Sequence, residues 1–273
     1  DHRDLHLSLC RQRQMCIRDS KYKARIKILI DEMGLEAYRQ EVEAEFEALD
    51  KAPFAIVGQE YARIAANIAQ AAPILEASDE LFEAKAFEDP AWLQNNVHAH
   101  KVPGHAIVSI SLKPRGGVPG DATAADMRAI ADLADTYSYG LLRVTHRQNL
   151  VLPYVRSKDL PALYQGLKQL GLATGNIGNA SDIIACPGLD YCALATARSI
   201  PIAQALSDAL VPREAKGDLH GISINISGCI NACGHHHAAN IGILGLNKAE
   251  RENYQITSVS YTHLRAHETK ANL

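Results

Sequence analysis

Residues 106–171 read AIVSISLKPRGGVPGDATAADMRAIADLADTYSYGLLRVTHRQNLVLPYVRSKDLPALYQGLKQLG and carry the clearest secondary-structure signal in the chain. In chain order, the pattern predicts a strand at 106–112, a helix that begins after Thr123, strands at 141–145 and 150–155, and a helix at 159–170 that Gly171 closes. The first helix is expected to bury Met127, Ile130, Ala131 and Ala134. The order strand–helix–strand–strand–helix is typical of a ferredoxin-like α+β half-domain.

The segments on either side of this unit are less regular. Apolar residues recur at helical spacing from Lys21 to Leu49, with Gly34 as a stop signal, and residues 51–102 form an Ala-rich connecting segment. After the unit, a helix interrupted at Pro201 is expected before strands at 221–226 and 239–246. The chain is therefore divided into a helical connecting segment at 21–102, the half-domain at 103–178, and a mixed α/β domain at 179–257.

The two ends differ from the rest of the chain. Residues 1–20 and 258–273 show neither helical nor strand periodicity, and both resemble translated adapter sequence at the edges of assembled gene fragments. We interpret them as non-native tails and leave them out of the fold prediction, together with Cys10 and Cys16.

The composition indicates a packed globular protein. Hydrophobic residues make up 47% of the chain, and the formal net charge of −3 gives no electrostatic reason to expect a nucleic-acid partner. No apolar run approaches the roughly 20 residues of a membrane-spanning helix, and the start has no signal-peptide core. We expect a cytoplasmic location, where thiols stay reduced and disulfides are rare.

Four cysteines remain to be explained, and they form two pairs. The first pair is Cys186-Pro-Gly-Leu-Asp-Tyr-Cys192 and the second is Cys229-Ile-Asn-Ala-Cys233. Four thiolates from separate loops suit a cubane iron–sulfur cluster. Five intervening residues in the first pair fit a zinc site poorly, and buried free thiols packed as small hydrophobic side chains are a further alternative. The spacing favours a cluster and leaves the two alternatives open.

The flanking sequence resembles a known family. The stretches DIIACPGLDYCALATARSIPIA and ISGCINACGHHHAANIGILG are similar to the paired cluster motifs of siroheme-dependent sulfite and nitrite reductases. The resemblance extends back through HKVPGHAIVSISLKPRGGVPGD and LLRVTHRQNLVLP to about residue 21. It implies that residues 179–257 form a siroheme and iron–sulfur cluster domain, with a 4Fe-4S cluster on Cys186, Cys192, Cys229 and Cys233.

The resemblance also implies roles for residues around the siroheme. Cys233 is expected to join the cluster to the siroheme iron, and Asn231 to lie beside the siroheme. The turn that holds Arg147, Gln148 and Asn149, together with Thr145, is expected to face this cofactor, where an Arg can pair with a siroheme carboxylate. We expect His235, His236 and His237 to orient their loop or face solvent.

The activity that the resemblance implies is six-electron reduction of sulfite to sulfide, as in bacterial assimilatory sulfite reductase. Reduction of nitrite to ammonia is the alternative within the family, and a zinc-stabilised binding module is the alternative of another class. The electron donor is expected to be a flavoprotein subunit or ferredoxin. The Arg and Lys side chains that bind the anion are expected in the family's other half, so this chain alone is not expected to reduce sulfite.

Overall fold

A computed structural model describes residues 26–50, 58–71, 73–78, 87–214, 219–248, 251–258 and 271–272. The chain divides into two compact units, residues 1–73 and 74–273. Both expected tails lie outside the described residues except 258, 271 and 272, of which 258 ends one strand and 271–272 form another.

The first unit contains three helices. These are α2 (Ile26–Met33), α3 (Leu35–Ala48) and α4 (Gly58–Ala71). Gly34 separates α2 from α3 with a φ of 83°, a left-handed conformation that glycine adopts without steric cost. The helix predicted up to Leu49 and its stop at Gly34 are confirmed, while residues 21–25 lie outside the described part of the chain.

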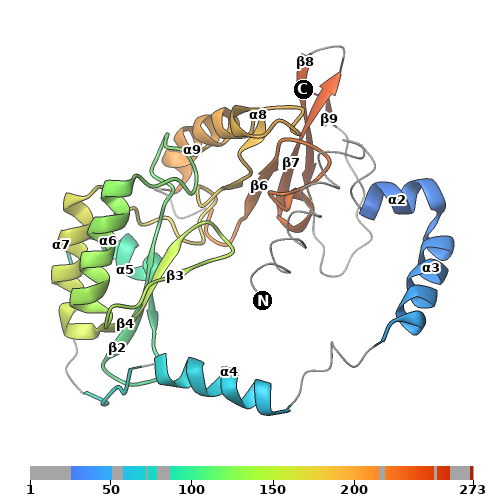
Figure 1. Ribbon diagram of the computed structural model, residues 1–273. Helices are drawn as coiled ribbons and strands as arrows, with labels where there is room; N and C mark the ends of the chain where they lie inside the picture. The colour runs from blue at the N-terminus through green and yellow to red at the C-terminus, as the bar shows by residue number, and fades with distance from the viewer. Residues whose placement is uncertain are drawn as a thin grey trace. The chain divides into compact units, whose positions relative to one another are not determined.

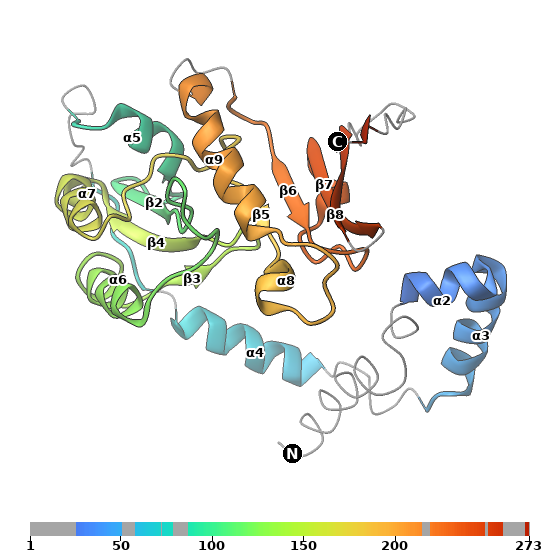
Figure 2. The same ribbon diagram turned by 90° about the horizontal axis from the view of Figure 1, so that it is seen from above.

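The second unit begins with a four-stranded antiparallel sheet of order β1-β2-β4-β3. Its elements are α5 (Pro90–Asn96), β1 (Val97–Ala99), β2 (His105–Ile110), α6 (Ala124–Tyr137), β3 (Arg143–Val144), β4 (Leu150–Arg156), η4 (Ser157–Asp159) and α7 (Leu160–Gln169). Figures 1 and 2 show α6 and α7 side by side against this sheet. The ferredoxin-like order is confirmed, and β1, which precedes residue 103, adds the edge strand beside β2.

The core of this half-domain explains which side of α6 faces inward. Ile130 and Ala134 are buried as predicted. Met127 is 40% exposed and Ala131 is also exposed, so the prediction that they are buried is wrong. The inward face continues through Leu133 and Tyr137, which pack against the core three and seven positions after Ile130.

The second sheet has the order β5-β6-β7-β8-β9, parallel from β5 to β7 and antiparallel from β7 to β9. Its elements are β5 (Ile184–Ala185), α8 (Gly188–Tyr191), α9 (Ile200–Glu214), β6 (Ile224–Ser227), η5 (His236–Ala238), β7 (Ile241–Lys248), β8 (Arg251–Ser258) and β9 (Ala271–Asn272). All four residues of β6 are buried, because β6 lies between two parallel strands.

The helix α9 corrects one prediction. Pro201 lies in its first turn, where the missing N–H costs no helical hydrogen bond, so Pro201 does not interrupt the helix. The proline inside the helix is Pro212. Ala203 is buried in the core of the second sheet, and Leu206 and Leu210 pack against that core, which places α9 over this sheet. Among the described helices, none combines the length and apolar character needed to cross a bilayer.

Candidate functional site: two cysteine loops at one sheet edge

The two cysteine pairs follow neighbouring parallel strands. Ala185 at the end of β5 lies opposite Ile226 of β6, and Cys186 is the next residue. The backbone N–H of Cys186 donates to the Ile226 carbonyl at 3.1 Å. Cys229 comes two residues after β6 ends. Since the carboxyl ends of parallel strands meet at one edge of a sheet, both loops start from the same edge.

Glycines let the two loops touch. A Cβ atom on Gly228 would lie 2.9 Å from the Cα of Gly188 and 2.5 Å from the carbonyl oxygen of Ala197, both too close for a real side chain. The Gly228 carbonyl accepts hydrogen bonds from the backbone N–H groups of Thr196 and Ala197, each at 2.9 Å. The loop of the first cysteine pair therefore packs directly against the loop of the second, with Gly188 against Gly228.

The sulfur of Cys186 already sits among hydrogen-bond donors. It accepts the backbone N–H of Gly228 at 3.1 Å and lies 3.4 Å from the Ser199 hydroxyl. N–H groups aimed at a sulfur are the contacts that tune iron–sulfur clusters. Cys186 and Cys229 are buried, Cys192 is half-buried and Cys233 is exposed, and all four are free thiols.

The donors fit a cluster in kind and in loop position, while their assembly around one metal stays a prediction. Within the described ranges, no three side chains of His, Cys, Asp or Glu are gathered as a metal-binding group. Four thiols on two touching loops match the four thiolates of a cubane cluster.

The side chains of the turn at 145–149 line two separate cavities. Arg147 and Asn149 line a cavity of about 390 Å³ with Thr145 and His146. Gln148 lines a separate cavity of about 360 Å³ beside Pro187 and Tyr191, next to the first cysteine pair. Of the four turn residues expected to face siroheme, the structure brings Thr145, Arg147 and Asn149 together and places Gln148 apart from them.

Gln148 binds the strand that leads to Cys186. Its side-chain amide donates to the Ala185 carbonyl at 2.8 Å and accepts the Ala185 N–H at 3.1 Å. Gln148 has a φ of 58°, a conformation that non-glycine residues rarely adopt. A Cβ on Gly120 would come within 2.8 Å of the Gln148 side chain, so the glycine leaves room for it.

Sequence reasoning missed a buried ion pair at the same place. The Lys113 ammonium lies 2.6 Å from the Asp182 carboxylate, and their side chains are 2% and 0% exposed. Burial lowers the pKa of Lys113, and the charge of Asp182 opposes this change. The two residues are 69 positions apart and belong to no motif, so the sequence gives no signal that pairs them.

The backbone on either side of Cys233 turns sharply. Ala232 and His235 have φ values of 57° and 53°, and the His235 carbonyl accepts a hydrogen bond from Asn225 at 3.2 Å. His235 and His237 are exposed and His236 is half-buried, and the expectation that these rings orient the loop or face solvent stays a prediction. Asn231 is half-buried between Cys229 and Cys233.

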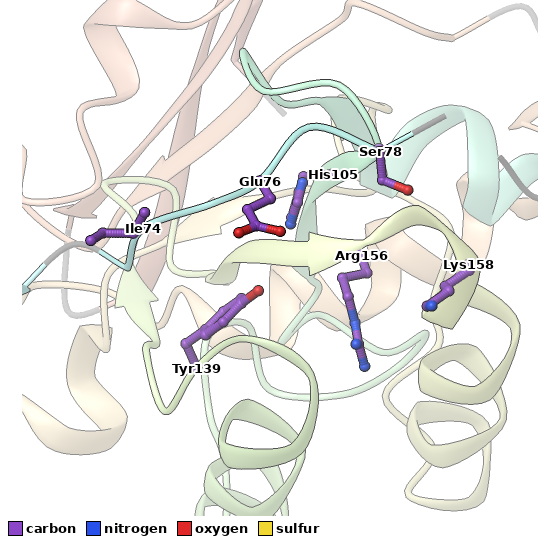
Figure 3. Close-up of a pocket in the computed structure, with 8 residues that line it drawn as sticks. Ile74, Glu76, Ser78, His105, Tyr139, Arg156 and Lys158 are labelled. Carbon is purple, nitrogen blue, oxygen red and sulfur yellow. The ribbon is translucent and has the colours of Figure 1, made fainter. Parts of the chain in front are cut away.

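A third cavity, of about 310 Å³, holds none of the predicted site residues. It is lined by Ile74, Glu76, Ser78, Gly104, His105, Tyr139, Arg156 and Lys158 (Figure 3). Its strand residues begin β2 and end β4, at the end of the half-domain sheet where His105 pairs with Arg156. Arg156 is held by Asp159 at 2.6 Å. None of the residues that line this cavity belongs to the cysteine loops.

Comparisons with known proteins agree with this architecture. Residues 108–170 match the family described as the nitrite/sulfite reductase ferredoxin-like half domain. The solved structure of the Mycobacterium tuberculosis NirA protein matches with a TM-score of 0.54 and 24% identity, over 94% of this chain and 42% of that protein. The likeness to NirA shows the fold.

Curated relatives extend the match across the cysteine loops. Ferredoxin–nitrite reductase of Synechococcus elongatus is 29% identical over 84% of this chain and 38% of its own length. The chloroplastic enzyme of the same name from Zea mays is 30% identical over 85% of this chain and 36% of its own. Sulfite reductase [ferredoxin] 2 of Mycolicibacterium paratuberculosis is 26% identical over 82% of this chain and 35% of its own.

The chain combines a ferredoxin-like half domain of the nitrite/sulfite reductase family with a second sheet that carries the two cysteine loops. Along most of its length the chain is similar to nitrite and sulfite reductases, and residues 108–170 match the half domain of that family. It spans little more than a third of the length of the three curated relatives named above.

Proposed function

We propose that this chain is the part of a sulfite or nitrite reductase that holds a 4Fe-4S cluster on Cys186, Cys192, Cys229 and Cys233 and a siroheme next to it. The observation that carries the proposal is the contact between Gly188 and Gly228, which packs the two cysteine loops together at one sheet edge. A bound siroheme would supply the iron at which the anion is reduced, and Cys233 would be the residue that holds it next to the cluster.

The protein's own contribution is to bind and orient these groups. The Gly228 N–H donates to the Cys186 sulfur at 3.1 Å, which is the kind of contact that tunes an iron–sulfur cluster. Arg147 lines the 390 Å³ cavity, and its Nε donates to Asp182 at 3.1 Å, which fixes the guanidinium for pairing with a siroheme carboxylate. Asn149 is held by Asp182 at 2.9 Å in the same cavity wall.

The substrate is an oxyanion of sulfur or nitrogen. Nitrite is the first substrate to test, because the relatives from Synechococcus elongatus and Zea mays are both named ferredoxin–nitrite reductase. Sulfite, the substrate expected from the cysteine motifs, is the second, supported by the relative named sulfite reductase. The same names favour ferredoxin over a flavoprotein as the electron donor, and the cytoplasmic location stays a prediction.

Siroheme binding can be tested on this chain with single substitutions. We expect the chain, produced anaerobically in a host with raised siroheme synthesis, to show siroheme bands and to yield siroheme on extraction. Cys233→Ser should lose the siroheme bands, and Arg147→Met should weaken siroheme retention. Cys10→Ser and Cys16→Ser serve as controls, since these residues lie outside both motifs. A purified chain that holds zinc and no iron or siroheme would support the binding module instead.

Substrate preference is tested on the siroheme-loaded chain by the visible spectrum during titration with nitrite and with sulfite. The proposal predicts that at least one anion shifts the siroheme bands, and the one that acts at lower concentration is the preferred substrate. A siroheme-loaded chain whose spectrum responds to neither anion would contradict the proposal that the siroheme held by this chain offers its iron to the anion.

A further inference from the structure

The carboxylate of Asp182 is the most heavily hydrogen-bonded side chain near the cysteine loops. It is fully buried and accepts from Lys113 Nζ at 2.6 Å, Asn149 Nδ2 at 2.9 Å, Arg147 Nε at 3.1 Å and the backbone N–H of Gly178 at 3.2 Å. These donors come from three separate segments of the chain. A buried carboxylate needs partners of this kind, because desolvation without them is costly.

The turn at 147–149 forms hydrogen bonds with two residues of the segment that leads to Cys186. Arg147 and Asn149 bind Asp182, and Gln148 binds both backbone groups of Ala185. Asp182 lies four positions before Cys186, and Ala185 lies one position before it. The strand β5 is only two residues long and pairs with β6 alone among the described strands, so its own ladder does little to fix its position.

On its other side, Cys186 contacts β6 and the second cysteine loop. The backbone N–H of Cys186 donates to the Ile226 carbonyl of β6, and the Cys186 sulfur accepts the N–H of Gly228. Cys186 therefore lies between the turn of the half-domain and the loop of the second cysteine pair. The position of its sulfur relative to Cys229 depends on both contacts.

We propose that Asp182 is a positioning residue that fixes Cys186 at the cluster site by locking the half-domain turn onto β5. This inference deepens the proposed function and rests on it. The carboxylate is required for its charge as well as its shape. Without the carboxylate, the ammonium of Lys113 stays buried beside the guanidinium of Arg147 with no counter-charge, and the turn separates from the strand.

The test measures the reactivity of individual thiols in the metal-free chain, so it does not depend on cluster loading. Native chain is treated with iodoacetamide, and the alkylation rates of Cys186 and Cys229 are measured by peptide mass spectrometry. Both thiols are buried, so their rates report local opening. Asp182→Asn should raise the Cys186 rate by about tenfold or more, with Cys229 changed much less. The control Asp190→Asn alters an exposed carboxyl in the first cysteine loop and should change neither rate.

A milder variant covers the case in which Asp182→Asn does not fold. Arg147 is 32% exposed and donates one bond to Asp182, so Arg147→Met removes one contact and keeps the buried Lys113–Asp182 pair. It should raise the Cys186 rate by a smaller factor than Asp182→Asn, again with Cys229 nearly unchanged. A Cys186 rate equal to wild type in the folded variants, or equal increases at Cys186 and Cys229, would overturn the inference.

Iron loading separates this inference from the proposed function. If Asp182→Asn exposes Cys186 and wild-type chain still takes up no iron and sulfide, the positioning role holds and the cluster assignment is wrong. If wild type loads a cluster and Asp182→Asn loads it equally well with an unchanged reduction potential, the positioning role is wrong and the cluster assignment holds.

Discussion

The hydroxyl of Tyr164 lies in an aromatic cluster where ionisation is costly. The centroid of its ring lies 5.2 Å from that of Phe87 and 5.0 Å from that of Trp92, and the hydroxyl donates to the Asp89 carboxylate at 3.3 Å. Burial, followed by the charge of Asp89, raises the pKa of Tyr164 to about 12. Burial also raises the pKa of Tyr254 to about 12, with Glu252 accepting its hydrogen bond.

The raised pKa of these two tyrosines predicts that the folded protein loses stability at alkaline pH. A raised pKa in the folded state gives stability that is complete below the unfolded value, near 10, and is lost as the pH rises through 12. The free energy of unfolding, measured in urea, should therefore fall between pH 10 and 12. Tyr164→Phe should flatten this fall, and Tyr191→Phe, at an exposed position, should not. A pH dependence in Tyr164→Phe identical to that of wild type would contradict the explanation.

Single residues also mark the limit of sequence reasoning at the site. The cysteine pairs are recognisable because their spacing is short and local. Arg147 and Asn149 were placed near a cofactor by resemblance, and they line one cavity. Asp182, which binds both, was missed because its partners are distant in sequence and an isolated aspartate carries no periodicity.

At the scale of elements, α6 shows how local chemistry fixes a boundary. Thr123 accepts the Asp126 N–H at 3.1 Å, and the Asp126 carboxylate accepts the Thr123 N–H at 2.9 Å, which together form a capping box. This start was predictable because both residues lie within one turn. The edge strand β1 was not, because three residues give no measurable alternation and its pairing with β2 is a tertiary contact.

Removal of the cap should destabilise the half-domain. Thr123→Ala is expected to lower the free energy of unfolding by about 0.5–2 kcal/mol, because a helix N–H loses its partner. The measurement is urea denaturation followed by circular dichroism. Thr136→Ala is the matched control in the same helix, since its hydroxyl only bonds back to Asp132 at an exposed position, and it should be nearly neutral.

The contact between the cysteine loops gives a second prediction at this scale. Gly228→Ala places a methyl group 2.5 Å from the Ala197 carbonyl oxygen, so the two loops must move apart. We expect a loss of stability of about 1–3 kcal/mol and reduced iron uptake. Gly58→Ala is the control, because nothing lies within 4 Å of its added Cβ. Normal stability and iron content in Gly228→Ala would show that the loops need not touch.

At the scale of the whole second unit, two differently built sheets meet at the cysteines. The half-domain contributes the turn at 145–149, and the parallel strands β5 and β6 contribute the loops. Alternation and helix caps predicted the half-domain well. They predicted the second sheet less well. The strands expected at 221–226 and 239–246 are β6 at Ile224–Ser227 and β7 at Ile241–Lys248, and β5 is too short to detect.

The central claim, that four cysteines on two touching loops hold one cluster, is tested most directly by iron and acid-labile sulfide analysis with Mössbauer spectroscopy. The measurement uses anaerobically reconstituted chain and its four single Cys→Ser variants. The account predicts about four iron and four sulfide atoms per chain with a cubane spectrum. Both should be lost on substitution of Cys186, Cys192, Cys229 or Cys233, and retained on substitution of Cys10 or Cys16. Wild-type chain that binds zinc in place of iron, or full iron content after loss of any of the four thiols, would contradict it.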